Sequence, residues 1–193
     1  NRSSFLYSII LLLLTGFSET TEKTSVFYLV EEKPDLFSKS STVPFIEKDF
    51  IGFREFLGFF ESGSDYRKIN RFGYLGKYQF GKGTLKIYGV TDINDFIYNP
   101  ELQEKVFLMN IKRNKWILRR EIKKYSNKSL GDLFITESGI LAAAHLSGPG
   151  NVKKFLRNKG ATDFNKKDAN GTSITDYIRI FKNYSLIKIE PVS

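Results

Sequence analysis

An apolar helical stripe over residues 46–60 most strongly constrains how this 193-residue chain can fold. The apolar side chains recur at spacings of 4, 3, 4 and 3: Ile46, Phe50, Phe53, Leu57 and Phe60. This spacing predicts an α-helix with one face that must be buried. Glu61-Ser62-Gly63 then ends the helix, because Gly63 is placed to take the left-handed cap conformation.

The rest of the chain alternates between glycine-rich and helical patterns. Residues 64–83 are rich in Gly and Tyr, which excludes a stable helix and predicts short strands or an ordered loop. Residues 84–97 predict two short helices, the second capped by Thr91 or Asp92. Pro100 opens a long helical stretch to about Tyr125.

The buried faces of that stretch are predicted from its apolar side chains. Leu102, Val106 and Met109 mark the first part. Its last part is marked by Leu118, Ile122 and Tyr125. We also expect Trp116 to lie in the core rather than on a sugar-binding surface.

Three further helices are predicted toward the C-terminus. Thr136 begins one that is rich in small residues and therefore suited to close packing at the centre of the domain. Pro149 begins the next, and the last runs from Ser173 to about Asn183. Together these patterns predict a mainly α fold, a helical domain with a small Gly/Tyr-rich strand-or-loop region lining a cleft.

The N-terminal residues predict export. In residues 1–18 one Arg precedes a 13-residue apolar run, and Gly16 and Ser18 are small residues suited to signal peptidase. A bilayer span needs about 20 apolar residues, so we expect a cleaved signal peptide, with an uncleaved anchor as the alternative. Residues 19–44 are a predicted polar linker before a domain over residues 45–193.

The inventory of reactive side chains excludes most classes of site. The chain has no Cys, which excludes disulfides, thiolate zinc sites, iron–sulfur clusters and cysteine nucleophiles. A single His excludes sites that need two imidazoles. We therefore expect no metal and no cofactor, and carboxylate chemistry, hydroxyl chemistry or plain binding remains.

The net charge of +9 indicates an anionic partner. Nine Lys/Arg and three Glu lie in residues 101–128, outside the candidate catalytic motifs. Because an exported basic protein meets envelope polymers rather than chromosomes, we expect attachment to an anionic wall and no nucleic-acid partner. Export without Cys suits the bacterial periplasm or cell envelope. A basic nucleic-acid or membrane-surface module is the competing interpretation.

Glu61 is the strongest candidate for chemistry. It follows the aromatic residues Phe59 and Phe60 and lies at the carbonyl end of the predicted helix. Apolar neighbours and the partly negative helix end both disfavour the ionised form of a carboxylic acid. A carboxylic acid kept protonated can deliver a proton to a leaving oxygen, as glycosidic cleavage requires.

Three later segments follow Glu61-Ser62-Gly63 in a fixed order. They are GKYQFG at residues 76–81, AAHLSGPGNV at residues 143–152, and Tyr177 within TSITDYI. Over roughly residues 46–184 this series resembles the lysozyme-like soluble lytic transglycosylases, whose relatives include goose-type lysozymes. That family looks like Glu-Ser, then Gly-Leu-Met-Gln, then Ala-Ala-Tyr-Asn-Ala-Gly-Pro-Gly, then a late Tyr.

The resemblance implies an α+β lysozyme-like fold and cleavage of the β-1,4 bond between N-acetylmuramic acid and N-acetylglucosamine in peptidoglycan glycan strands. It implies a single catalytic Glu and a 1,6-anhydro product. We expect a monomer with no stable membrane span after signal cleavage. Glu61 matches the catalytic acid, Gln79 the sugar-binding Gln, and Tyr177 the Tyr that orients the acid. His145 takes the place of the motif's Tyr.

Tyr78 and Gly148 complete the expected substrate-binding set. Lys77-Tyr78 replaces Leu-Met, which predicts a basic and aromatic groove wall. Leu146 replaces the motif's Asn. Tyr66 and Tyr74 are also suited to stacking on sugar rings.

Two alternatives concern the reaction itself. A hydrolytic muramidase needs a second carboxylate, which Asp65 or Asp92 could supply. A non-catalytic envelope-glycan-binding protein on the same fold needs none. Glu137 repeats the Glu-Ser-Gly string, but in the first turn of a helix it stays ionised and is unsuited to act as a general acid.

Overall fold

Helix α2, Phe50–Ser62, begins and ends through local bonds that the sequence encodes. In the computed structural model, which describes residues 47–167 and 171–193, Asp49 accepts a bond from the Gly52 amide at 3.0 Å. Gly63 has φ 74° and donates its N–H to the Phe59 carbonyl at 2.8 Å. This cap confirms the predicted helix end.

The Gly/Tyr-rich segment forms an ordered loop rather than a sheet. Isolated bridges join Leu75 to Ile69 and to Phe80. The loop is followed by two short helices, α3 at Lys82–Ile87 and α4 at Ile93–Tyr98, as predicted. Asp92 caps α4 by accepting bonds from the amides of Asn94 and Asp95.

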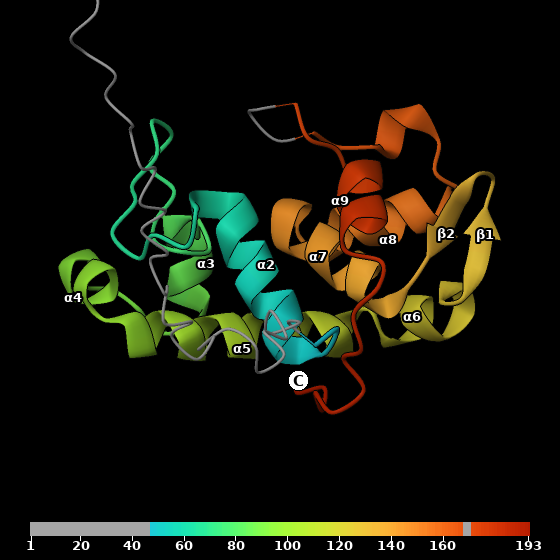
Figure 1. The fold of residues 1–193 in the computed structure, drawn as a ribbon. Coiled ribbons are helices and arrows are strands. Elements are labelled where there is room, and N and C mark those ends of the chain that lie inside the picture. The colour runs from blue at the N-terminus through green and yellow to red at the C-terminus, as the bar shows by residue number, and fades with distance from the viewer. Residues whose placement is uncertain (1–46, 168–170) are drawn as a thin grey trace, which may run out of the picture. The chain divides into compact units, whose positions relative to one another are not determined.

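The long basic stretch forms two helices rather than one. Helix α5 spans Pro100–Ile117 and helix α6 spans Arg119–Tyr125. The helical conformation is interrupted between them at Leu118. In Figure 1, α5 extends along one side of the domain beneath α2, α3 and α7.

A small hairpin follows that the sequence patterns did not predict. Strand β1, Lys128–Leu130, pairs antiparallel with β2, Leu133–Ile135. Each strand has three residues, and the burial alternates along β2. Such a short strand carries too little periodicity to be recognised from sequence.

The C-terminal helices are α7, Glu137–Ser147; α8, Pro149–Arg157; and α9, Ile174–Ile180. A 3-10 turn, η1, spans Thr162–Phe164. Thr136 caps α7, Pro149 is the first residue of α8, and Ser173 forms a capping box with Asp176, in agreement with the predicted starts.

Helix α7 is the centre of the packing. It contacts α5, α8 and α9, and its residues from Ser138 to Ala144 are buried. A Cβ on Gly139 would lie 2.8 Å from the Ile178 carbonyl oxygen of α9. The small side chains of α7 therefore let the two backbones approach closely, and α9 is held where it carries Tyr177.

The described residues are mainly helical, as expected, and contain one two-stranded sheet. Three predicted core residues are misplaced, since Phe60 is 40% exposed, Met109 is 37% exposed and Trp116 is 38% exposed. The predicted signal peptide, residues 1–18, and linker, residues 19–44, lie outside the described residues. No helix in the described part is both long and apolar enough to cross a bilayer.

Candidate functional site

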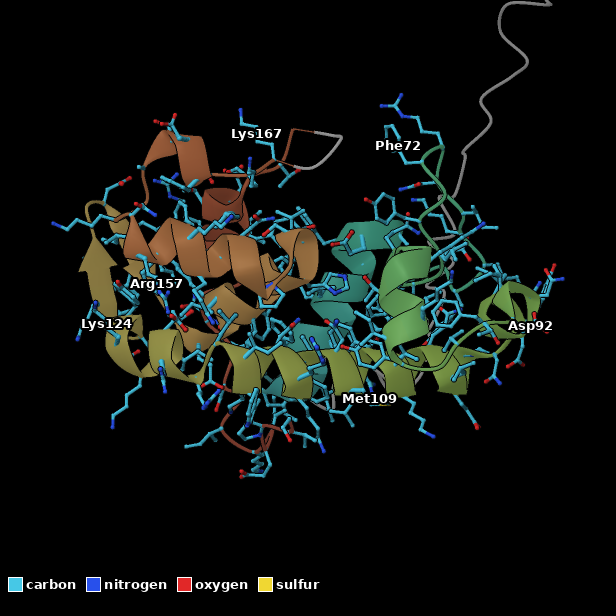
Figure 2. All side chains as sticks on the ribbon, turned by 180° about the vertical axis from the view of Figure 1, so that it is seen from behind. Phe72, Asp92, Met109, Lys124, Arg157 and Lys167 are labelled. Carbon is cyan, nitrogen blue, oxygen red and sulfur yellow. The ribbon has the colours of Figure 1, made fainter. Side chains whose placement is uncertain are left out.

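A groove of about 640 Å³ lies among α2, the Gly/Tyr-rich loop, α3, α5 and the junction of α7 with α8. Its lining includes Glu61, Gln79, His145 and Gly148, four of the six predicted site residues. Figure 2 shows Phe72 and Lys167, two further lining residues, on separate segments along the upper side of the view.

Glu61 is the next-to-last residue of α2, so its side chain projects from the carbonyl end of that helix into the groove. The side chain is 16% exposed. Its Oε1 accepts a hydrogen bond from the Tyr177 hydroxyl at 2.6 Å. The carboxyl group is therefore accessible to a ligand and is held in position by the Tyr177 hydroxyl.

Tyr177 supplies that support from α9. Its side chain is buried and does not line the groove. Phe60 packs against its ring edge-on at 5.4 Å, and Phe181 packs at 5.5 Å. The aromatic packing fixes the ring, and the ring fixes the hydroxyl against Glu61.

His145 lies next to the same carboxyl group. Its Nε2 is 2.8 Å from the Tyr78 carbonyl oxygen and 3.9 Å from Glu61 Oε1. Since a carbonyl only accepts, Nε2 must carry the hydrogen. Burial lowers the pKa of His145 to about 4, so the ring is neutral at neutral pH. Its Nδ1 is buried without a hydrogen-bond partner in the described part of the chain.

Gln79 and Gly148 shape the groove through unusual backbone conformations. Gln79 has φ 48°, and its Nε2 donates to the Gly76 carbonyl at 2.8 Å. Gly148 has φ 79° and is shared by the end of α7 and the start of α8. Only a residue without Cβ takes that conformation easily, and here it turns the chain along the groove.

Tyr78 does not line the groove, which corrects its assignment as a sugar-binding residue. Its ring is fully buried and stacks on Phe107 at a centroid distance of 4.0 Å. Its hydroxyl donates to the Glu104 carboxylate at 2.8 Å, and burial raises its pKa. A ring enclosed in this way has no face to offer a ligand.

Lys77 is buried as well, so the prediction that Lys77 and Tyr78 form a basic and aromatic groove wall is wrong. Its ammonium lies 2.8 Å from Glu55 and 3.0 Å from Glu104. Burial alone lowers the pKa of Lys77, but the bonds to these carboxylates outweigh burial and raise it. Lys77 and Tyr78 form a charged network behind the site, and the network anchors the carbonyl that His145 contacts.

Some aromatic residues of the loop line the groove, and others belong to the charged network around Glu104. Tyr74 is 45% exposed and lines the groove, as does Phe72 at 49%. Tyr66 does not line it and donates its hydroxyl to Glu104 at 2.7 Å. Tyr74 thus has the expected position, Tyr66 does not, and Phe72 was missed although it belongs to the same Gly/Tyr-rich segment.

Polar residues of α5 were also missed. Asn110, Arg113 and Asn114 line the groove. Their spacing of three and four residues places them on one helix face, a signal present in the sequence. The apolar side chains nearby, Met109 among them, masked that signal.

Glu61 is the only carboxylate lining the groove among residues 47–167 and 171–193. Asp65 and Asp92 instead accept bonds from backbone amides near their own positions. Glu137 lies 2.6 Å from the Lys115 ammonium and also lies outside the groove lining. None of the three lines the groove with Glu61.

The described residues contain no group of three or more Asp, Glu or His side chains placed to hold a metal ion. The arrangement is that of a single carboxyl group, hydrogen-bonded by a phenol and lying beside a neutral imidazole, in a groove with aromatic and amide side chains. Comparisons with known proteins found no matching family, no matching curated protein and no matching solved structure.

Proposed function

We propose that this chain is an exported enzyme that cleaves the β-1,4 bond between N-acetylmuramic acid and N-acetylglucosamine in peptidoglycan glycan strands. The observation that carries the proposal is the 2.6 Å bond between Tyr177 and the groove-lining carboxyl group of Glu61. The resemblance to lysozyme-like lytic transglycosylases pairs these same two positions, on sequence grounds independent of the geometry.

Glu61 acts first as a general acid. The glycosidic C1–O bond breaks, its electron pair stays on the bridging oxygen, and that oxygen takes the proton of Glu61. Tyr177 donates to Oε1, which leaves the other carboxyl oxygen, Oε2, to carry the proton.

Glu61 then acts as a base. The 6-hydroxyl of the muramoyl residue attacks C1, its proton passes to the Glu61 carboxylate, and a 1,6-anhydro end forms without water. The lining offers no second carboxylate among the described residues, which favours this course over inverting hydrolysis. A lytic transglycosylase is therefore preferred to a hydrolytic muramidase.

The other lining residues suit a glycan strand. Phe72 and Tyr74 offer exposed rings on which the apolar faces of sugars can stack. Gln79 and Asn151 offer amide groups within the same groove. His145 stays neutral and donates its Nε2 hydrogen to the Tyr78 carbonyl, so it lies beside Glu61 without competing for its proton.

The test is release of muropeptides from purified peptidoglycan. The unmodified protein should release them, and Glu61→Gln should lower the rate by at least about a hundredfold. Glu101→Gln is the matched control, because Glu101 is exposed at the start of α5 and outside the groove lining. Equal release by Glu61→Gln would refute Glu61 as the acid.

Product mass separates the alternatives. An anhydro end is lighter than a hydrolysed end by one water, so mass spectrometry distinguishes a lytic transglycosylase from a muramidase. A non-catalytic glycan-binding protein on the same fold would bind the polymer and release nothing. In that case Glu61→Gln would leave binding unchanged.

A further inference from the structure

One wall of the groove is built from polar residues that the proposed cleavage does not use. Asn110, Arg113 and Asn114 project from one face of α5, and Tyr88 lies beside them at the end of α3. Asn110 is 7% exposed and Asn114 is 2% exposed. Buried amides in the middle of a helix are costly unless their bonds are satisfied, so this wall is a built polar surface.

The side chains on this wall form a chain of hydrogen bonds in which each residue donates to the next. Asn114 Nδ2 donates to Asn110 Oδ1 at 3.0 Å, and Asn110 Nδ2 donates to the Tyr88 hydroxyl oxygen at 3.2 Å. Burial raises the pKa of Tyr88, so its hydroxyl keeps its hydrogen. That hydrogen has no acceptor among the described residues and remains available to a ligand.

The charge of the groove is positive on balance. Arg113, Lys166 and Lys167 line it, and Glu61 is the one carboxylate in the described part of the lining. Arg113 has no ion pair with any described residue. It lies close enough to Tyr88 to act on its hydroxyl electrostatically. Because Asn110 contacts the Tyr88 hydroxyl and Arg113 lies one turn further along the same helix face, the guanidinium and the phenol O–H line the same part of the groove.

We propose that Arg113 and the Tyr88 hydroxyl form a subsite for a carboxylate carried by the glycan strand. The identity of the strand rests on the proposed function; the anionic character of the subsite does not. A guanidinium presents a planar pair of donors that matches a carboxylate, and the half-buried setting strengthens the bond relative to open solvent. Asn110 and Asn114 hold the Tyr88 oxygen in place.

Two parts of a peptidoglycan strand carry such a group. One is the lactyl ether of a peptide-free muramoyl residue, and the other is the peptide attached to that ether. Both present the same chemistry to Arg113. Two ligand pairs separate them: a peptide-free tetrasaccharide with its methyl ester, and a peptide-bearing tetrasaccharide with its fully amidated form.

Binding is measured by calorimetry with the full chain carrying Glu61→Gln, at fixed ionic strength, so that no cleavage is needed. In at least one pair, the free acid should bind about tenfold or more tightly than its neutral form, as expected for a charge-assisted bond. Adding Arg113→Gln should abolish that preference, and Arg113→Lys should keep part of it. Arg120→Gln, an exposed α6 residue outside the groove lining, should keep it in full.

The outcomes are separable from those of the proposed function. Equal binding of acid and neutral forms in both pairs, or no binding of any of them, would overturn the subsite whether or not the unmodified protein releases muropeptides. A preference that survives Arg113→Gln would overturn the assignment to Arg113. A preference lost only with Arg113→Gln supports the subsite even if no cleavage is detected.

Discussion

The hydroxyl of Tyr177 lies 2.6 Å from Oε1 of Glu61, although 116 positions separate the two residues in the chain. The bond joins the C-terminal end of α2 to the middle of α9. Helix α7 packs directly on α9 through Gly139, so the position of the phenol depends on the central packing of the domain. The geometry of the site is therefore coupled to the stability of the core.

Replacing Tyr177 by Phe tests that bond. The ring and its contacts with Phe60 and Phe181 remain, but the donor to Glu61 is lost. We expect the cleavage rate to fall about 10- to 100-fold, because the carboxyl group is no longer oriented. Muropeptide release under initial-rate conditions is the measurement.

Tyr184→Phe is the control for that substitution. Tyr184 is half-buried and packs on Phe53 and Phe56, but it does not line the groove. Its loss of a hydroxyl should leave the rate within about twofold. Equal losses of rate in both variants would show that the Tyr177 effect is a general consequence of weakened packing.

Close packing between α7 and α9 predicts a second sensitivity, at Gly139. An added Cβ would meet the Ile178 carbonyl oxygen at 2.8 Å, where backbone rather than a flexible side chain must move. Gly139→Ala should lower the free energy of unfolding by about 1–3 kcal/mol and should also lower activity, because α9 carries Tyr177. Urea unfolding and muropeptide release measure the two effects.

Gly150→Ala is the matched control for Gly139. Gly150 lies within α8, and nothing lies within 4 Å of its added Cβ. Alanine is a better helix former than glycine, so stability should be unchanged or rise by up to about 1 kcal/mol. If Gly139→Ala proved as harmless as Gly150→Ala, the close approach of α7 and α9 would not hold.

These helix ends and caps could be predicted because their signals are local. Gly63, Asp92, Thr136 and Pro149 act on the backbone within a few residues of themselves, and all four occupy the predicted roles. The pairing of Glu61 with Tyr177 came from the order of motifs rather than from any local pattern. It needed a resemblance to a family in which the two positions act together.

Burial was harder to predict because it depends on what covers each face. Helix α5 buries Gln103 and Asn110, whose amides bond to neighbouring segments, and Asn114, whose amide bonds to Asn110; it exposes Met109. A rule that places only apolar residues inside finds Val106, but it misses these buried amides and misplaces Met109. Tyr78 was misassigned for the same reason, since Glu104 that encloses its hydroxyl is 26 positions away.

The buried position of Tyr78 predicts a structural rather than a binding role. Tyr78→Phe keeps the stack on Phe107 but removes one of the donors that hold the Glu104 carboxylate. Hydrogen bonds to Glu104 from Tyr66, Tyr78 and Lys77 together outweigh burial and lower the pKa of that carboxyl group. We expect the free energy of unfolding to fall by about 1–2 kcal/mol, measured by urea unfolding.

Glycan affinity separates the two roles of Tyr78. The affinity of Tyr78→Phe for a peptide-free tetrasaccharide should remain unchanged. If Tyr78 instead bound sugar through its ring and its hydroxyl, removing the hydroxyl would weaken binding. Tyr125→Phe, a half-buried residue outside the groove, is the control for stability. A loss of affinity with unchanged stability would contradict the buried role.

His145 predicts how stability depends on pH, and it is the only His in the chain. Its pKa of about 4 in the folded protein lies below the value of about 6.5 expected when unfolded. Between these values the unfolded chain binds a proton that the folded chain does not, so stability should fall as pH falls from about 6.5 toward 4. The full loss is roughly 3 kcal/mol.

The measurement compares urea unfolding of the unmodified protein and of His145→Gln at pH 7.5, 6, 5 and 4.5. Glu104 and Asp176, whose pKa values are lowered in the folded protein, also lose stabilising charge in acid, so both proteins should weaken. Only the unmodified protein carries the imidazole, and its decline below pH 6.5 should be steeper. Parallel curves would show that His145 titrates normally, and that the imidazole beside Glu61 is charged in mild acid rather than the neutral donor that the groove geometry requires.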